Sequence, residues 1–213
     1  TSDEKIKSLS NTKKNSQKLI VDKKGNIDFS SPEIFSSEKI IITLPFKRSF
    51  IPANIYELQI KSIIEKIKEY STEKTQVIFT SSTSIYPKNY EIVNEFTPLE
   101  ELNTRQQVLL NVENLIKNQF SNFIILRLGG LFGGSRKIGM FMNNKQTLEN
   151  ANSPVNLIHR KDVINIIELI IQKNIQSELF NCVCNHHPSK EELYDYHAKL
   201  LNKQPPKFIE NKI

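Results

Sequence analysis

Short apolar segments alternate with amphipathic helical patterns along the middle of the chain. Residues 39–45, 75–80 and 123–128 are largely apolar runs of strand length, rich in isoleucine, valine and phenylalanine. Between them, apolar side chains recur at helical spacing over about 52–70 and 104–120. Continuous apolar strands that alternate with such helices are typical of a parallel sheet covered by helices on both faces. The sequence therefore predicts an α/β fold in which the strand at 39–45 is buried on both faces.

The flanking parts of the chain are patterned less uniformly. Residues 1–37 are mostly polar, with a short strand expected at Leu19–Val21 and a turn at Lys24–Asn26. Towards the C-terminus, we expect a helix at 162–173, a strand at 179–184 and a helix at 190–201. Asp162 has the side chain and the position of a helix N-cap.

Composition narrows the classes of protein and partner. The chain has 213 residues, of which 38% are hydrophobic, enough for one folded domain. Its 29 basic against 23 acidic residues give a net charge of +6, which favours anionic partners such as nucleotides and phosphates. The basic residues form no stripe with interleaved aromatic side chains, so a nucleic-acid partner is disfavoured. No apolar run reaches the length of a membrane span, and Cys182 and Cys184 lie too close in sequence for a disulfide framework. We therefore expect a cytoplasmic protein without a membrane partner.

Three polar or glycine-rich segments follow the predicted strands directly. They are Thr43–Phe46, the hydroxyl-rich Thr80–Tyr86, and Gly129–Gly134, which holds four of the six glycines in the chain. In open parallel sheets, ligands bind beyond the carboxyl ends of the strands. Clustered glycines indicate that the backbone turns tightly or that something approaches it closely. The sequence thus predicts a ligand site at these strand ends.

Five segments resemble the motifs of one known family. Phe79–Tyr86 resembles the SSxxVYG segment of the extended short-chain dehydrogenases/reductases, the NAD-dependent epimerase/dehydratase family, and Glu95–Pro98 resembles the E-x-x-P that follows it. Leu126–Gly133 is similar to LR-x-x-x-x-YGP, Val155–Val163 to N-x-I-H-V-x-D-V-A, and Phe180–Cys184 to the YNV-x strand. The segments occur in the family's order over about 39–208, and the ITLP at Ile42–Pro45 resembles a bacterial branch.

The resemblance implies a single Rossmann-type domain over 1–213 that binds NAD or NADP and a nucleotide sugar or similar small molecule. A small substrate-side lobe would comprise about 135–160 and 185–213. The family's catalytic hydroxyl falls at Ser82. The implied cofactor contacts are Thr43, Leu44, Pro45, Ser81, Leu128, Gly129 and Gly130, and the implied substrate contacts are Thr83, Tyr86, Arg136, His159 and Arg160. Simpler interpretations stay open, such as Ser82 in a strand-end turn, Tyr86 packed beneath a loop and Arg136 on a solvated loop.

The family's glycine-rich G-x-x-G-x-x-G has no counterpart upstream of Lys39, where Gly25 stands alone. By the resemblance, a first βαβ unit of roughly 30 residues is missing, and with it the residues that distinguish NAD from NADP. In the 3-2-1-4-5-6 strand order, the missing strands form the middle of the sheet, which leaves the strand at Ile40–Leu44 with a bare apolar edge. We therefore expect the chain to be a fragment of a longer protein, or that edge to be covered by something else.

The catalytic Tyr-x-x-x-Lys of the family is replaced as well. Its following glutamate matches Glu113, which puts Leu109 at the lysine position and Arg105 at the tyrosine position. Leucine has no proton to exchange and arginine stays protonated, so neither supports the usual proton transfer. The literal match Tyr70–Lys74 lies between a predicted helix and the start of a strand, at the wrong end of the sheet.

Cys182-x-Cys184 followed by His186-His187 contains metal-ligand residue types. Adjacent histidines point apart, and the cysteine spacing differs from that of structural zinc sites. We therefore expect core side chains there and no metal.

Three functions are compatible with the sequence. The leading one is an NAD(P)-dependent epimerase/dehydratase-like protein. Its status as an enzyme stays open, because the family's proton donor is replaced. The alternatives are a catalytically silent nucleotide- or protein-binding relative and a nucleic-acid binder that keeps only the fold. The expected partners are a dinucleotide and a small-molecule substrate, with a homodimer as a further candidate.

Overall fold

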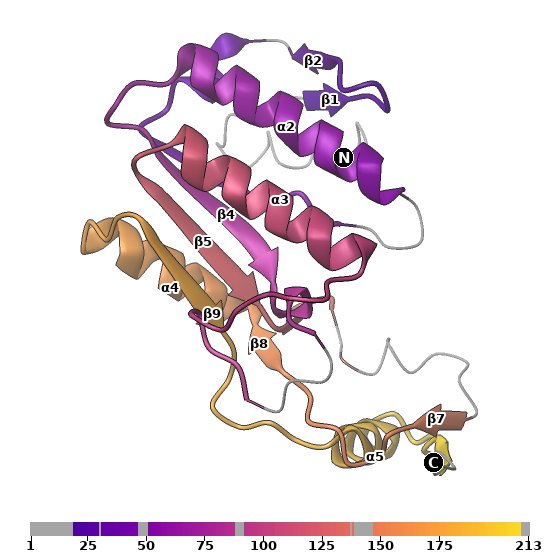
Figure 1. The fold of residues 1–213 in the computed structure, drawn as a ribbon. Helices are drawn as coiled ribbons and strands as arrows, with labels where there is room; N and C mark the ends of the chain where they lie inside the picture. The colour runs from indigo at the N-terminus through magenta and orange to yellow at the C-terminus, as the bar shows by residue number, and fades with distance from the viewer. Residues whose placement is uncertain are drawn as a thin grey trace. The chain divides into compact units, whose positions relative to one another are not determined.

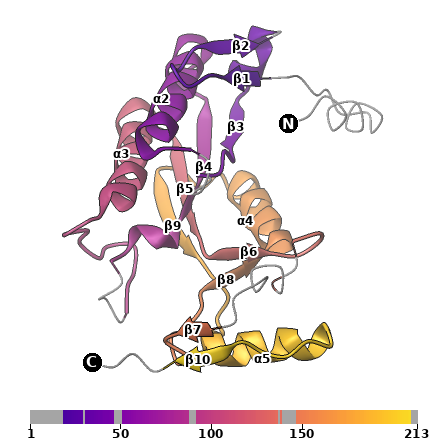
Figure 2. The same cartoon turned by 90° about the vertical axis from the view of Figure 1, so that its right-hand side faces the viewer.

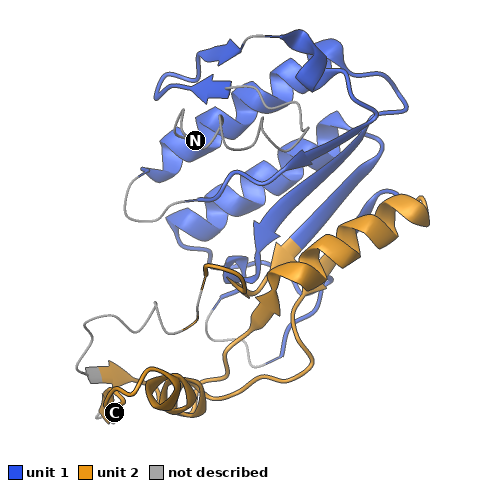
Figure 3. Ribbon diagram, turned by 180° about the vertical axis from the view of Figure 1, so that it is seen from behind, with its two compact units in different colours: residues 1–126, 176–179 blue, residues 127–175, 180–213 orange. Residues whose placement is uncertain are grey.

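The computed structural model describes residues 19–29, 31–46, 51–87, 92–136, 138 and 147–209 (Figure 1). The chain divides into two compact units, which Figure 3 shows in two colours. Unit 1 comprises residues 1–126 with 176–179, and unit 2 comprises residues 127–175 with 180–213. Two strands, β5 (Phe123–Leu128) and β9 (Glu178–Cys182), contribute residues to both units.

The central sheet has four strands in the order β3-β4-β5-β9. β3 (Lys39–Ile42), β4 (Gln76–Ser82) and β5 lie at the apolar runs that the sequence predicts as strands. β3 and β4 are parallel, with Lys39 opposite Gln76 and Ile42 opposite Phe79. β4 extends beyond the predicted 75–80, as far as Ser82. A parallel sheet flanked by helices confirms the predicted α/β fold of Rossmann type.

The two helices predicted in the middle of the chain are confirmed as α2 (Ala53–Tyr70) and α3 (Thr104–Gln119). They lie side by side over one face of β4 and β5 (Figures 1 and 2). Their apolar stripes form one buried cluster with the sheet, whose members include Tyr56, Ile60, Ile64, Ile67, Phe79 and Ile116. α3 begins with a capping box, in which Asn103 Oδ1 accepts from the backbone N–H of Gln106 and Gln106 Oε1 accepts from that of Asn103.

The burial of β3 corrects the prediction. Ile42 is 6% exposed, whereas Ile41, which points to the other face, is 43% exposed. By contrast, Val77, Ile78 and Phe79 of β4 are all 0% exposed. The physical reason is position in the sheet: β3 ends the strand order and pairs with β4 alone within the described residues.

A β-hairpin precedes the sheet. β1 (Leu19–Val21) confirms the predicted strand, and it pairs antiparallel with β2 (Ile27–Phe29), which is too short to show a periodicity in the sequence. The turn lies at Lys24–Asn26 as predicted, where Gly25 has φ +83°, a left-handed conformation that favours glycine. A short 3-10 helix at Pro32–Phe35 then leads into β3.

Unit 2 contains α4 (Arg160–Gln172) and α5 (Lys190–Leu200), which confirm the predicted helices, and most of β9, which ends at Cys182 instead of the predicted Cys184 (Figure 2). Two parallel pairs of short strands were not predicted: β6 (Gly130–Phe132) with β8 (Leu157–His159), and β7 (Thr147–Glu149) with β10 (Lys207–Ile209). Each has three residues, which leave no periodic signal.

The N-cap of α4 is His159 and not Asp162 as predicted. The imidazole Nδ1 of His159 accepts from the backbone N–H of Lys161 at 3.2 Å, so the helix begins before the predicted residue. Asp162 lies in the first turn, where a carboxylate is favoured by the positive end of the helix.

The predicted lobe residues 137, 139–146 and 210–213 lie outside the described residues, as do residues 1–18. Within the described ranges, the structure contains no helix with the length and apolar character that crossing a bilayer requires.

Candidate functional site

The carboxyl ends of β3 and β4 lie next to each other in unit 1. Ile42 is opposite Phe79 in the parallel register, and Thr80 Oγ1 donates to the carbonyl of Ile42 at 3.3 Å. The segments Thr43–Pro45 and Ser81–Thr83 therefore start at the same edge of the sheet. Thr43 and Pro45 are exposed, and Leu44 is half-buried. This edge brings together two of the three predicted strand-end segments.

The segment after β3 is held by aromatic contacts. Tyr56 of α2 donates its hydroxyl proton to the carbonyl of Leu44 at 3.1 Å. The ring of Tyr56 stacks on Phe46, with centroids 4.5 Å apart and planes 6° from parallel. The guanidinium carbon of Arg105 lies 4.9 Å from the centroid of the Phe46 ring. Burial raises the pKa of the Tyr56 phenol above its ordinary value, so Tyr56 stays a hydrogen-bond donor.

The hydroxyl groups after β4 are engaged in local contacts. Buried Ser81 donates from Oγ to Oε1 of Glu113, which is 0% exposed, at 2.6 Å. Ser82 Oγ accepts from the backbone N–H of Ser84 at 3.2 Å and donates to Ser84 Oγ at 2.9 Å. Ser82 thereby caps the short 3-10 helix Thr83–Ile85. This geometry is the strand-end turn that the simpler interpretation describes, and the catalytic role of Ser82 stays a prediction.

Tyr86 is 7% exposed and lies beneath the loop that follows it. Its hydroxyl donates to the carbonyl of Asn94 at 2.9 Å, and its own carbonyl accepts from Gln106 Nε2 at 2.8 Å. The two contacts join Tyr86 to residues 8 and 20 positions further along the chain, as expected of a packed side chain. A contact between Tyr86 and a substrate stays a prediction.

The residues at the family's Tyr and Lys positions have structural surroundings. Leu109 is 4% exposed in a small apolar cluster with Ile85 and Tyr86, and Arg105 lies over the ring of Phe46. The literal match Tyr70–Lys74 spans the end of α2 and the residues before β4, at the amino end of that strand. The absence of the usual proton relay from these residues stays a prediction.

In unit 2, the chain's own backbone approaches the first two glycines of the cluster. The N–H of Gly129 donates to the carbonyl of Cys182 at 3.0 Å, and that of Gly130 donates to the carbonyl of Asn156 at 2.7 Å. A Cβ atom on Gly129 would lie 2.9 Å from the carbonyl oxygen of Asn156. The close approach that the glycines predict is therefore real, and neighbouring strands account for it; ligand contacts of Leu128, Gly129 and Gly130 stay predictions.

The second half of the cluster turns beside two basic side chains. Gly133 and Gly134 have φ of +106° and +63°. A Cβ atom on Gly133 would clash with the imidazole of His159, and one on Gly134 would lie 2.8 Å from the guanidinium of Arg160. The backbone of Arg136 pairs with Gly133 across the same turn. The structure thus gathers three predicted substrate contacts, Arg136, His159 and Arg160, around one tight turn.

The imidazole of His159 has a defined role in this turn. Its ring packs edge-on against Phe132, with centroids 5.1 Å apart. Because Nδ1 accepts the backbone N–H of Lys161, the proton of the neutral ring lies on Nε2, which faces Gly133. His159 is therefore placed by helix capping as well as by packing.

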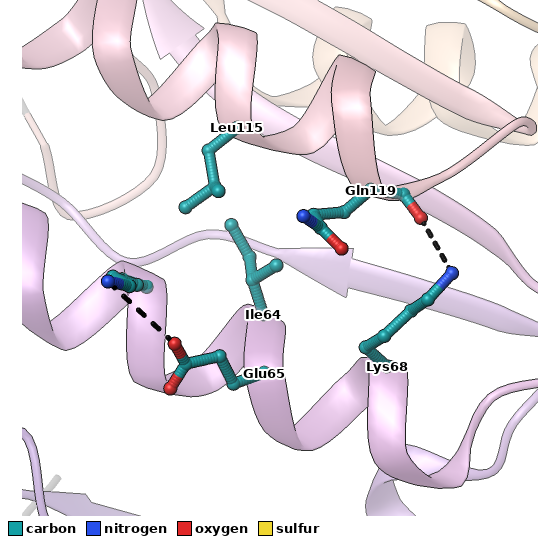
Figure 4. Close-up of a pocket in the computed structure, with 6 residues that line it drawn as sticks. Ile64, Glu65, Lys68, Leu115 and Gln119 are labelled. Atoms are coloured by element: carbon teal, nitrogen blue, oxygen red, sulfur yellow. Dashed lines mark hydrogen bonds and ion pairs between the residues drawn. The ribbon is translucent and has the colours of Figure 1, made fainter.

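Two grooves lie away from all these residues. Ile64 of α2 and Leu115 of α3 form the apolar part of the first, which has a volume of about 210 Å³ (Figure 4). Lys61 and Glu65 pair across its rim at 4.0 Å, and Lys68 Nζ donates to the carbonyl of Gln119 at 3.1 Å. The second groove, of about 360 Å³, is lined by His186, Pro188, Glu192, Leu193 and Tyr196. In the described part of the chain, no three His, Cys, Asp or Glu side chains gather as a metal site requires.

Comparison with known proteins identifies a curated relative by sequence. No family model matches the chain. The protein YeeZ of Escherichia coli (strain K12) is 31% identical over 176 residues, which cover 82% of this chain and 63% of YeeZ. The chain thus spans less than two thirds of the curated relative that it matches.

Three solved structures share the arrangement of elements at low sequence identity. The UDP-glucuronic acid 4-epimerase of Bacillus cereus, in complex with NAD, has a TM-score of 0.62 at 18% identity and covers 82% of this chain and 63% of its own. The chain has the fold of the extended short-chain dehydrogenases/reductases. A dTDP-4-dehydrorhamnose reductase of Clostridium acetobutylicum (TM-score 0.64, 14% identity, 81% and 65% covered) and the ADP-L-glycero-D-manno-heptose-6-epimerase of Helicobacter pylori (0.61, 15%, 81% and 61%) agree.

The described residues meet the requirements of a dinucleotide site only in part. The exposed Thr43 and Pro45 offer contacts at the carboxyl end of β3. The glycines at 129–134 instead enclose the short strand β6, and among the described residues up to Arg136 no helix begins that could hold a pyrophosphate. The acid–base pair does not fit, because Arg105 and Leu109 stand at its positions. Contacts with a dinucleotide therefore stay a proposal, and no proton-transfer step follows from the described residues.

Several residues of this region were missed or underused by the sequence analysis. Phe46 and Tyr56 carry no motif, and their stacking joins a loop to a helix face that only folding brings together. Gln106 is different, because its spacing from Asn103 is the signal of a capping box.

Proposed function

We propose that this chain binds NAD or NADP and acts on or binds a nucleotide sugar or a similar small molecule. The observation that carries the proposal is the shared fold with an epimerase whose structure contains NAD and whose named substrate class is a nucleotide sugar. The net charge of +6 agrees with anionic ligands of this kind. Because the chain spans 63% of its curated relative, the activity of the whole protein is part of the proposal.

The proposed contacts are those that the resemblance implies. In unit 1, Thr43, Leu44, Pro45 and Ser81 contact the dinucleotide, while Ser82, Thr83 and Tyr86 face the substrate. Leu128, Gly129 and Gly130 are further proposed contacts of the dinucleotide. Arg136 and Arg160 contribute the positive charge that a phosphate group favours, and His159 offers its Nε2–H as a hydrogen-bond donor to the substrate. These three residues lie around Gly133–Gly134, and this arrangement supports their assignment as substrate contacts.

A second candidate is a catalytically silent binding protein. The observation that favours it is the surroundings of Arg105 and Leu109. Leu109 is enclosed by apolar neighbours and Arg105 is stacked on Phe46, so neither position exchanges a proton at neutral pH. Both candidates require dinucleotide binding, and they differ in turnover.

Titration with NADH and NADPH, followed by the fluorescence of the reduced nicotinamide, tests what the candidates share. A dissociation constant in the micromolar range supports dinucleotide binding, and a preference between the two assigns the cofactor. No binding at millimolar concentrations contradicts the proposal for this chain. Affinity for nucleic acid that falls steeply with salt would favour the third function instead.

Turnover separates the enzyme from the silent binder. The chain is incubated with NAD and UDP-glucuronic acid, and products are separated by chromatography. Ser82→Ala removes the proposed catalytic hydroxyl, and Ser84→Ala is its matched control, since it breaks the same Ser82–Ser84 hydrogen bond and keeps the Ser82 hydroxyl. Loss of turnover in Ser82→Ala alone supports catalysis by Ser82, whereas equal loss in both supports a structural turn. Binding without turnover supports the silent relative.

Two further expectations accompany the proposal. A homodimer stays a prediction, and sedimentation velocity of the purified chain tests it. A cytoplasmic location agrees with the two free thiols, Cys182 and Cys184, and it also stays a prediction.

A further inference from the structure

Arg105 occupies a position where a cation needs compensation. It is the second residue of α3, two positions after the N-cap Asn103. The N-terminus of a helix carries partial positive charge, which disfavours a cation in the first turn. The same position matches the tyrosine of the family's Tyr-x-x-x-Lys. A specific contact of the Arg105 side chain is therefore expected to offset the unfavourable position.

That contact is the ring of Phe46. The Arg105 guanidinium carbon lies 4.9 Å from the ring centroid, within the distance of a cation–π interaction. The ring is also stacked on Tyr56, which is 1% exposed and bonded to the carbonyl of Leu44. Phe46 packs against two apolar clusters of unit 1, the main one and the small one around Leu109. One side chain thus ties the strand-end segment to both α2 and α3.

We propose that Arg105 is a positioning residue, whose stacking on Phe46 holds the Thr43–Phe46 segment so that Thr43 and Pro45 are presented to a bound dinucleotide. Two contacts on the segment support this: Tyr56 fixes Leu44 from α2, and Arg105 fixes Phe46 from α3. The turn of α3 that carries a proton donor in the family serves here to organise a binding loop. The inference rests on the proposed dinucleotide binding for its ligand, while the clamp itself is a property of the free protein.

The first test measures NADH affinity in matched variants. Arg105→Ala and Phe46→Leu are expected to weaken binding about two- to five-fold, which corresponds to a cation–π contact of about 0.5 to 1 kcal/mol. Phe46→Tyr keeps an aromatic ring and should bind like the wild type. Arg105→Lys keeps the charge without the planar guanidinium and should fall between. Gln107→Ala, an exposed residue of the same helical turn, is the control.

Two further results make the test specific. If Arg105 acts through Phe46, the double variant Arg105→Ala/Phe46→Leu weakens binding no more than either single variant. A merely structural role would lower the melting temperature in step with affinity, and Phe46→Tyr would then not restore affinity selectively. Variants that fail to fold are replaced by Arg105→Lys and Phe46→Tyr, which retain charge or ring.

Hydrogen exchange of the Leu44 and Phe46 amides in the free protein tests the clamp without any ligand. Faster exchange in Arg105→Ala than in Gln107→Ala supports it, and equal exchange overturns it. Faster exchange with unchanged NADH affinity overturns the positioning role. If the wild type binds no dinucleotide, the proposed function fails and the positioning role fails with it, while the exchange result still decides on the clamp.

Discussion

Replacing Leu109 by lysine tests whether the fold could accommodate the family's proton relay. Leu109 is 4% exposed and packs with Ile85 and Tyr86 in the small apolar cluster of unit 1. The long methylene stem of lysine can replace much of the leucine volume, so the main cost of Leu109→Lys is the burial of an ammonium group. We expect the variant to fold with strongly reduced stability.

The magnitude follows from the enclosed position. Full burial lowers the pKa of a lysine by up to about 3–5 units, and each unit corresponds to about 1.4 kcal/mol. A depression of roughly 2 units, appropriate for a helix side chain near a loop, gives a loss of about 3 kcal/mol at neutral pH. The folded pKa is then below the unfolded one, so between the two values the unfolded state binds more protons. The variant therefore gains stability as the pH rises towards about 10, where the unfolded lysine also loses its proton.

Urea unfolding followed by far-ultraviolet circular dichroism at a series of pH values measures this effect. Leu109→Met is the matched control, because it conserves volume and apolar character and should cost less than about 1.5 kcal/mol. The difference between the two variants should shrink by about 1.4 kcal/mol per pH unit above the depressed pKa. A lysine variant as stable as the methionine variant at neutral pH, with no pH dependence, would refute the reasoning and show that the site can hold a lysine.

Three further outcomes are expected. Tyr86→Phe removes the donor to the carbonyl of Asn94 and should lower the free energy of unfolding by about 1 kcal/mol; an unchanged urea midpoint would contradict this. Gly133→Ala places a Cβ at φ +106° against the ring of His159 and should cost roughly 2 kcal/mol, measured by thermal unfolding; an unchanged melting temperature would contradict this. Burial lowers the pKa of His197, so the unfolded state takes up its proton first and this residue makes the fold less stable as the pH falls below about 6.5; a proton-resonance titration that places the pKa at or above that value would contradict the prediction.

The predicted elements succeeded where the pattern was long. α2 and α3 begin and end within a residue or two of the predicted ranges, because a repeated apolar spacing over many residues is a local signal. Failures occurred where partners decide the outcome. Ile41 lies in an apolar run that is typical of a strand buried on both faces, yet its side chain is 43% exposed. The reason is that β3 is the last strand in the sheet order, which the run itself does not indicate. The start of α4 depends on the His159 imidazole, which is a rarer cap than the carboxylate of Asp162.

In the candidate site too, local patterns predicted the position of the segments, whereas tertiary contacts decided the state of each side chain. The order of motifs indicated the fold and the edge of the sheet where a ligand site is expected, since these follow from strand ends in sequence order. The state of each side chain did not follow. The Ser82 hydroxyl is committed to Ser84, and the glycine at 129 is explained by a neighbouring backbone. Neither fact can be read from a motif, because a hydroxyl or a glycine satisfies a turn and a ligand equally well.

The sequence by itself determined the α/β class and the order of the longer helices and strands, and the resemblance placed Arg105 and Leu109 at the Tyr and Lys positions, because periodicity and residue identity are local properties of the chain. Only the tertiary structure decided what the replacements do. Ser81 meets Glu113 across 32 residues of sequence, and Arg105 reaches Phe46 from another element. Such contacts form when helices dock on a sheet, and their partners are chosen by packing. Thus Arg105, which in the sequence marks only a missing proton donor, is in the fold a side chain that holds the loop after β3.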